Sequence, residues 1–274
     1  MLMAAQSTLT VAFDILAVEL NLKFQSDMNI EQSSEIKFSI GNDKEIGLIS
    51  APGVFTPNAT TNLLIQAVKS RITKPANLLD LGCGTGVVGI ALHLQGLINS
   101  PLCASDLSAS AVLCSRENLK RYGCAAEVRG GSLFEPWQGK KFDVIVDDIS
   151  GIAQGVADVS PWFQGVPCDT GKDGTDLVVE IIRNAPKHLN DGGSFFFPVL
   201  SLSNVDMLLQ KARENFATVE RVGRQDWPLP AELKVHMPLL RKLSAEGSIK
   251  LEEKFGMVLC YTEVYFAANP YLSN

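Results

Sequence analysis

The part of the sequence best suited to chemistry is a glycine-rich segment that begins with a carboxylate. It reads Asp80-Leu81-Gly82-Cys83-Gly84-Thr85-Gly86 and lies between a predicted strand and a predicted helix. Glycine lets the backbone approach a ligand closely and adopt conformations that other residues avoid. Loops at the carboxyl ends of strands bind ligands in open α/β sheets. We therefore expect a cofactor to contact Asp80 and four residues of this loop, namely Gly82, Cys83, Gly84 and Gly86.

A second acid ends the next predicted strand. Asp106 stands in the segment Ala104-Ser105-Asp106-Leu107. A carboxylate at that strand end can accept hydrogen bonds from both hydroxyl groups of a ribose. The sequence thus predicts a nucleoside-containing cofactor, with Asp106 on its ribose and Leu107 beside it.

Two cofactor classes fit this loop. Gly84, Gly86 and Gly89 satisfy the GxGxxG pattern, and Asp106 follows at the spacing typical of NAD(P) sites. Asp80, however, precedes the first glycine, and an acid there suits a cofactor that carries an amino group and a sulfonium. The chain also shows one continuous strand and helix pattern without a second catalytic domain. These features favour S-adenosylmethionine over NAD(P).

Alternating helices and apolar strands must position these residues. Strands are predicted over 78–81, 102–105, 126–129, 142–146, 194–197, 218–222 and 257–267. Helices are predicted from Thr56-Pro57 to 68 and over 86–94, 109–122, 176–189, 204–216 and 230–244, and a turn over 190–193. This alternation predicts a Rossmann-like, mostly parallel sheet with helices on both faces. The last strand is expected to run antiparallel.

The N-terminal fifth of the chain has a different pattern. Residues 1–25 carry apolar side chains at helical spacing, and residues 35–50 alternate like a hairpin. We therefore expect a small accessory region over residues 1–50 and a cofactor-binding domain over residues 51–274.

Composition limits the partners and the compartment. The chain has 274 residues and a formal net charge of −6, without a run of lysine or arginine. Such a chain lacks the basic stripe typical of proteins that grip many phosphates. No apolar run is long enough to span a bilayer. The six cysteines form no CxxC pair and do not stand near histidine at metal-ligand spacing. We expect no metal, no membrane, reduced thiols and a cytoplasmic protein; the oligomeric state stays open.

The glycine loop and its flanks resemble a known family. Residues 78–91, LLDLGCGTGVVGIA, look like motif I of the class I S-adenosylmethionine-dependent methyltransferases. The resemblance covers about residues 50–268 and implies a seven-stranded sheet with the last strand antiparallel. More narrowly, the chain resembles the subgroup of release-factor glutamine and ribosomal RNA guanine methyltransferases. The supporting segments are GVFTP at 53–57, GSLFEP at 131–136 and GKDGTDL at 171–177.

The resemblance also implies an adenine site and reveals a first departure. Ser132 and Leu133 would lie beside the adenine. The family usually has an aspartate where Ser132 stands. A serine hydroxyl can form a hydrogen bond to the adenine amino group but does not supply that charge.

The second departure concerns the catalytic signature. The subgroup carries Asn-Pro-Pro-Tyr after its fourth strand, whereas this chain has Asp148-Ile149-Ser150-Gly151. An asparagine amide both donates and accepts, but an ionised aspartate only accepts. Asp148 is therefore the candidate for orienting or deprotonating the acceptor; alternatively it only caps a turn. Its neighbour Asp147 is interpreted as an ordinary loop acid.

These departures direct the functional expectation away from the subgroup. We expect methyl transfer to a nitrogen or oxygen nucleophile of a small metabolite or peptide. The alternatives are methylation of a protein glutamine or ribosomal RNA base, and a protein that binds the cofactor without catalysis. Trp162 and Phe163 are candidates for the wall of the acceptor pocket, and His236 lies in a predicted lid. Each of these three can equally be structural.

Overall fold

The computed structural model describes residues 33–41, 44–149, 151–163 and 170–271, except for the side chain of Phe163. The helix predicted over residues 1–25 lies outside the described residues. Within the described part, one large sheet has the strand order β5-β4-β3-β6-β7-β10-β8, and a short strand β9 pairs with β10. The first two strands, β1 and β2, form a separate hairpin.

The strands of the large sheet fall into a parallel half and an antiparallel half. β3 pairs in parallel with β4 and β6, β4 with β5, and β6 with β7, whereas β10 is antiparallel to β7 and to β8. The predicted antiparallel last strand is thus confirmed. The strands are β3 (Leu78–Leu81), β4 (Leu102–Asp106), β5 (Ala126–Gly130), β6 (Phe142–Asp147), β7 (Leu189–Leu200), β8 (Phe216–Pro228), β9 (Glu252–Lys254) and β10 (Met257–Pro270).

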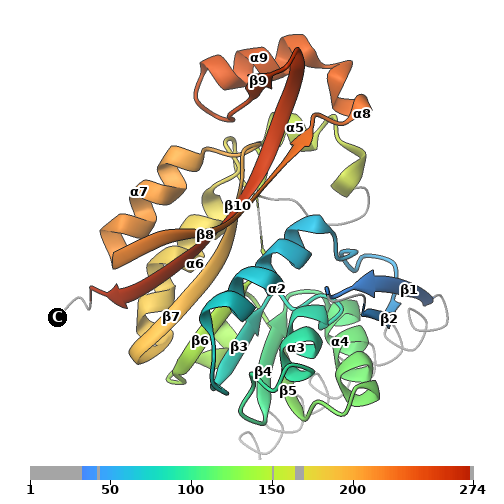
Figure 1. Cartoon of the computed structure of the whole chain (residues 1–274), viewed down its shortest axis with the longest axis vertical. Helices are drawn as coiled ribbons and strands as arrows, with labels where there is room; N and C mark the ends of the chain where they lie inside the picture. The colour runs from blue at the N-terminus through green and yellow to red at the C-terminus, as the bar shows by residue number, and fades with distance from the viewer. Residues whose placement is uncertain (1–32, 42–43, 150, 164–169, 272–274) are drawn as a thin grey trace, which may run out of the picture.

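Helices cover both faces of this sheet, as predicted (Figure 1). One face packs on α2 (Ala59–Arg71), α3 (Val87–His93) and α4 (Ala109–Arg121), and the other on α6 (Asp176–Asn184) and α7 (Val205–Asn215). Successive strand residues point to opposite faces. Leu78 and Val146 therefore lie in the core under α2 and α3, while Leu79 and Ile145 lie in the core under α6.

The long strands β8 and β10 extend past the other strands and carry a small outer module (Figure 1). Helices α5 (Gln154–Ala157), α8 (Ala231–Lys234) and α9 (Met237–Ala245) belong to it. The module has its own core, in which Val156 of α5, Leu233 of α8 and Leu240 of α9 are buried together with Cys260 of β10. Helices α8 and α9 of this module lie on either side of His236, in the region that the sequence analysis predicts as a lid.

The N-terminal hairpin is hydrogen-bonded to side chains at the end of α4. It consists of β1 (Ser34–Ser39) and β2 (Glu45–Ser50). The Asn118 side chain exchanges hydrogen bonds with the backbone N–H and C=O of Ile49, and the Tyr122 hydroxyl does the same with Gly47. Ile46 and Leu48 are buried in the core of the main sheet. The hairpin therefore shares its core with the main sheet.

Several element boundaries differ from the predictions. The strand predicted over 218–222 is the longer β8, and the helix predicted over 230–244 is divided into α8 and α9. Helix α2 begins at Ala59, because the Asn58 side chain caps it by accepting from the backbone N–H of Thr60. Helix α6 ends at Asn184 and continues as a 3-10 turn over Ala185–His188, since Pro186 cannot donate to the helix. Residues 190–193, predicted as a turn, belong to β7, whose pairing with β6 shifts register there.

The described residues include no helix that is long and apolar enough to cross a membrane. Within the same ranges, no group of three or more potential ligands is arranged to hold a metal ion. Five cysteines in the described part are buried and free of disulfides: Cys83, Cys103, Cys114, Cys124 and Cys260.

Candidate functional site

A cavity of about 690 Å³ opens at the carboxyl ends of β3, β4 and β6. Its lining brings together chain segments that are far apart in the sequence, because parallel strands end at the same edge of the sheet. The glycine loop, Asp106, Ser132 and Asp148 all contribute to it. Its volume lies in the range typical of sites for small molecules and cofactors.

The glycine loop holds its shape through backbone hydrogen bonds to the neighbouring strand. The N–H groups of Gly82 and Cys83 both donate to the carbonyl oxygen of Ser105, each at 2.9 Å. Gly82 has φ +69°, and a Cβ there would come within 2.3 Å of Ile149 Cγ1. Gly84 has φ +51°, and a Cβ there would meet only the Phe55 carbonyl oxygen, at 3.9 Å. Gly82 thus lets the loop pack tightly against Ile149, whereas Gly84 borders open space near Phe55.

Asp106 stabilises this loop while it faces the cavity. Its Oδ2 accepts from the N–H of Gly84 and its Oδ1 from the N–H of Ser108, both at 2.9 Å. Burial raises the pKa of the Asp106 carboxyl, and these backbone hydrogen bonds oppose the rise. A carboxylate oxygen has two lone pairs, so each oxygen keeps capacity for a further donor such as a ribose hydroxyl. The predicted neighbour Leu107 also lines the cavity and is 72% exposed.

Asp80 lies beneath the loop and does not line the cavity. The residue is fully buried, and its Oδ2 accepts from the N–H of Gly89 in α3 at 3.1 Å. Its Oδ1 has no hydrogen-bond partner among the described residues. Burial raises the pKa of Asp80 to about 7, and the nearby Asp148 and Asp106 add to the rise. Gly86, which begins α3 with φ +78°, is likewise buried behind the loop.

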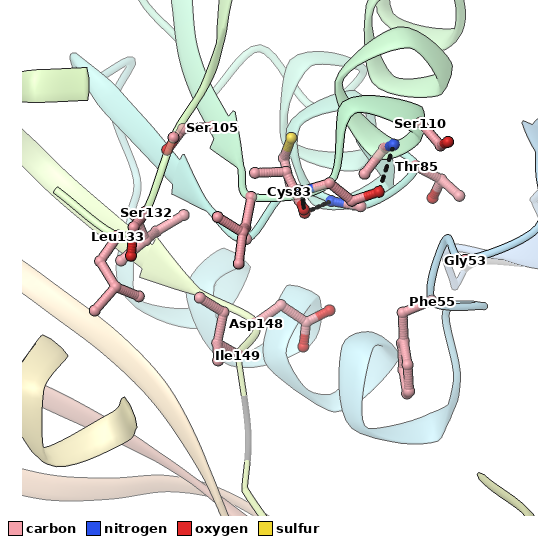
Figure 2. Close-up of a pocket in the computed structure, with 18 of the residues that line it drawn as sticks. Gly53, Phe55, Cys83, Thr85, Ser105, Ser110, Ser132, Leu133, Asp148 and Ile149 are labelled. Carbon is pink, nitrogen blue, oxygen red and sulfur yellow. Dashed lines mark hydrogen bonds between the residues drawn. The ribbon is translucent and has the colours of Figure 1, made fainter. Parts of the chain in front are cut away.

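The cavity has two opposite walls (Figure 2). Ser132 and Leu133 form one of them, and Phe55 and Gly53 the other. The Ser132 N–H donates to Glu135 Oε2 at 3.3 Å, and Leu133 adopts a φ of +46°. This is an uncommon conformation for a branched side chain. Two apolar side chains, Leu133 and Phe55, therefore flank the space in between.

Asp148 lies between these walls, directly after β6 (Figure 2). The Thr61 hydroxyl of α2 donates to its Oδ2 at 2.8 Å, and its backbone N–H donates to the Leu81 carbonyl oxygen at 3.3 Å. Burial raises the pKa of Asp148 to about 7, against the lowering effect of the Thr61 hydrogen bond. A carboxyl group with a pKa close to neutral can both accept and release a proton at physiological pH.

Asp147 corrects one prediction. It was interpreted as a loop acid, but it is the last residue of β6 and is fully buried. Its Oδ1 accepts from the N–H of Ile149 at 2.9 Å, and its Oδ2 has no partner among the described residues. Burial raises the pKa of Asp147 well above its usual value, and Asp148 and Asp80 contribute. A neutral Asp147 fits this environment, because an unpaired buried charge is costly.

Two of the sequence candidates for the acceptor side lie outside the lining of this cavity. Neither Trp162, which is 38% exposed, nor His236, which precedes α9, belongs to its lining. The side chain of Phe163 lies outside the described residues. Sequence reasoning missed Ser110 in the lining and Thr61 behind Asp148. Residues 60 and 61 are consecutive threonines in the first turn of a helix, and only the tertiary structure shows which one reaches the site.

Comparisons with known proteins show what this chain is similar to. Residues 45–148 match the model of the methyltransferase small domain family. The matched range includes the glycine loop and ends at Asp148. Together with the fold and the cavity, this match shows that the chain is similar to the class I S-adenosylmethionine-dependent methyltransferases, and it supports S-adenosylmethionine as the cofactor. Within that class, its relatives are release factor glutamine methyltransferases and ribosomal RNA small subunit methyltransferases C.

Two curated relatives and one solved structure illustrate the similarity. A release factor glutamine methyltransferase of Geobacter sulfurreducens is 29% identical over 58% of this chain and 58% of its own length. A ribosomal RNA small subunit methyltransferase C of Alcanivorax borkumensis is 34% identical over 53% of this chain and 40% of its own length. The 16S rRNA N2 methyltransferase of T. thermophilus, solved with AdoMet and guanosine, superposes with a TM-score of 0.55 over 87% of this chain and 51% of its own. That structure is 18% identical and supports the fold.

The chain therefore spans about half the length of these relatives, from 40% to 58% of the two curated ones. Both curated relatives are named for a macromolecular acceptor, a release factor or a ribosomal RNA. These matches overturn the prediction of a small-molecule or peptide acceptor. That prediction relied on the missing Asn-Pro-Pro-Tyr signature and the acidic net charge, and neither feature measures the size of the acceptor.

Proposed function

We propose that this protein transfers the methyl group of S-adenosylmethionine to a planar nitrogen of a macromolecule of the translation machinery. That nitrogen is a glutamine amide of a release factor or an amino group of a ribosomal RNA base. One observation carries the proposal: Asp148, the glycine loop and Asp106 line the same cavity. The relatives supply the acceptor class, because one kind acts on a release factor and the other on ribosomal RNA.

We assign the cofactor contacts by position in the cavity. Asp106 accepts hydrogen bonds from the ribose, Ser132 and Leu133 contact the adenine, and the backbone of residues 82–84 lies along the amino acid part. Asp80 acts through the loop, because its carboxylate lies beneath the loop backbone. A negative charge at this position favours a cationic ligand. Bound S-adenosylmethionine supplies a methyl group that is already activated by the sulfonium.

The remaining chemistry requires orientation and proton removal, and Asp148 can perform both. Its carboxylate accepts an N–H of the acceptor and turns the nitrogen lone pair toward the methyl carbon. As the new N–C bond forms, the C–S electron pair leaves with sulfur and the nitrogen releases a proton, which Asp148 accepts. A base with a pKa of about 7 is well matched to this step at neutral pH. Positioning two reactants in line is a large part of such catalysis.

The test measures transfer of a labelled methyl group from S-adenosylmethionine to two acceptors. These are a release factor and small ribosomal subunits from a strain that lacks this protein. We expect incorporation into one of them and a strong loss with Asp148→Ala. Arg241→Ala is the matched control, since Arg241 lies in the outer module and pairs only loosely with Glu253, at 3.7 Å. Cofactor binding without transfer to either acceptor would contradict the proposal.

A further inference from the structure

Behind the cavity, a chain of hydrogen bonds reaches Asp148 from the start of α2. The backbone N–H of Asn58 donates to Thr61 Oγ1 at 3.4 Å, and the Thr61 hydroxyl donates to Asp148 Oδ2 at 2.8 Å. A hydroxyl has one proton to donate. Because Thr61 accepts from Asn58, its own proton is directed to Asp148. The direction of this chain is therefore fixed.

Thr61 is shielded from solvent. The side chain is 1% exposed and does not line the cavity. Thr61 occupies the third position of α2, inside a capping box in which the Asn58 side chain holds the helix end. The short loop just before Asn58 contributes Phe55 and Pro57 to the cavity wall. The start of α2 thus joins the wall of the cavity to the carboxylate at its centre.

We propose that Thr61 is a positioning residue that holds the Asp148 carboxylate in the orientation for methyl transfer. By engaging Oδ2 from behind, the Thr61 hydroxyl leaves Oδ1 directed to the acceptor. Asp80 and Asp147 are the titratable groups that face Asp148 from the sheet, and Asp106 lies further along its edge. The first turn of α2 carries no acidic residue. Among these neighbours Thr61 is the donor that stabilises the ionised carboxylate. This inference rests on the proposed function.

The neighbouring Thr60 provides a matched control. It is also buried and on the same helical turn, but its hydroxyl pairs with that of Thr262 on β10 at 3.2 Å. Replacing either threonine with valine removes one buried hydroxyl at nearly constant shape. A difference between the two variants therefore excludes the general cost of losing a hydroxyl and reports the two contacts of Thr61, with Asp148 and with the N–H of Asn58. The shift of the pH–rate profile then singles out the contact with Asp148.

The experiment compares Thr61→Val, Thr61→Ser and Thr60→Val in two assays. For Thr61→Val we expect kcat to fall about ten- to hundred-fold, the range that one hydrogen bond to a charged group supplies, with KM for the cofactor unchanged. The acidic limb of the pH–rate profile should shift to higher pH by about one unit, because the carboxylate loses a donor. Thr61→Ser should restore most of the rate, and Thr60→Val should keep it. Equal losses in both valine variants, or an unchanged profile in Thr61→Val, would overturn the inference.

The second assay does not depend on turnover. Titration of carboxyl carbons by NMR, with the Asp148 signal assigned through Asp148→Asn, measures the pKa of Asp148 directly in the free protein. A higher pKa in Thr61→Val supports the hydrogen-bond link, and an identical pKa refutes it. If the wild-type protein methylates neither acceptor, the proposed function fails while this assay still decides whether Thr61 controls Asp148. An active wild type with an insensitive Thr61→Val variant refutes only the role of Thr61.

Discussion

Asp80 and Gly89 are joined by a hydrogen bond of 3.1 Å that closes the glycine loop from below. The acceptor is the carboxylate that precedes the loop, and the donor is a backbone N–H in the first turns of α3. A Cβ on Gly89 would come within 2.4 Å of Leu102 Cδ2 and within 3.4 Å of Asp80 Oδ2. Helix α3 can therefore approach the sheet this closely only with glycine at position 89.

The first prediction follows from this close approach. Gly89→Ala should destabilise the protein by about 1–3 kcal/mol, as overpacking of a core does. For a chain of this size, the melting temperature should fall by about 2–4 °C per kcal/mol, measured by calorimetry. Gly130→Ala is the control, since the nearest atom to a Cβ there is Val112 Cγ2 at 3.9 Å. Equal melting temperatures for the two variants would contradict the packing argument.

The second prediction concerns the ribose. Asp106→Ala should weaken binding of S-adenosylhomocysteine about ten- to hundred-fold, because hydrogen bonds to a charged acceptor are worth about 1.5–3 kcal/mol. Isothermal titration measures the dissociation constant directly. Asp106→Asn separates charge from geometry, since the amide keeps one acceptor oxygen. An unchanged constant in Asp106→Ala would remove Asp106 from the cofactor site.

The third prediction concerns the pH dependence of stability. Burial raises the pKa of Asp80 to about 7, far above its ordinary value of 3.8, so the folded state binds more protons than the unfolded state between about pH 4 and pH 7. The free energy of unfolding should therefore decrease as the pH rises through this window and level off above it. Urea titrations at several pH values measure this slope. Asp80→Asn should make the slope shallower, and an identical slope would disprove the assignment.

The fourth prediction separates the possible roles of Asp148. Asp148→Asn should lower kcat about 10²–10⁴-fold, the usual cost of losing a general base, while cofactor affinity stays constant. A preserved rate with amide or amine acceptors would instead show that Asp148 orients the nitrogen and does not take its proton. If Asp148→Ala lowers the melting temperature but the folded fraction keeps normal turnover, the residue is structural.

The fifth prediction links the N-terminal hairpin to the cofactor loop. The Asn118 side chain is fully buried and donates to the carbonyl oxygens of both Ile49 and Thr85. Asn118→Ala leaves these buried polar groups unpaired, which costs about 1–3 kcal/mol per group. We expect a lower melting temperature together with weaker binding of S-adenosylhomocysteine. Loss of stability with unchanged cofactor affinity would show that the hairpin does not support the loop.

Much of the fold could be predicted from the sequence, because hydrophobic periodicity depends on local spacing. The strands around Leu79 and Ile145 are short apolar runs, and the amphipathic pattern of α6 placed its buried side chains on one face. The boundaries that differed depend on particular hydrogen bonds. Because Asn58 caps α2, the helix begins at Ala59 and not at Thr56-Pro57. Because the pairing of β6 with β7 shifts register, Gly192 and Gly193 belong to β7 and not to a turn.

The site was less predictable, because its key contacts join residues distant in the chain. Asp106 was predicted from its position at a strand end, and Asp148 from its alignment with the subgroup's catalytic signature; both line the cavity. The motif placed Asp80 next to the cofactor, but its side chain points below the loop and contacts Gly89. The Thr61 hydrogen bond to Asp148 spans 87 positions and leaves no pattern in the sequence. The proposed acceptor class rests on the relatives, since no residue spacing encodes it.

The length of β10 has a practical consequence. A strand of 14 residues, at about 3.3 Å per residue, spans roughly 45 Å from the outer module to the far edge of the sheet. Its first residues follow a turn in which Phe255 is 97% exposed and Gly256 has φ +73°. A fluorescent dye attached at Phe255→Cys would lie at the tip of the outer module. Its position relative to the sheet would be fixed, because β10 is paired with its neighbouring strands. Energy transfer from that dye to a labelled ribosomal subunit or release factor would report which face of the protein its acceptor approaches.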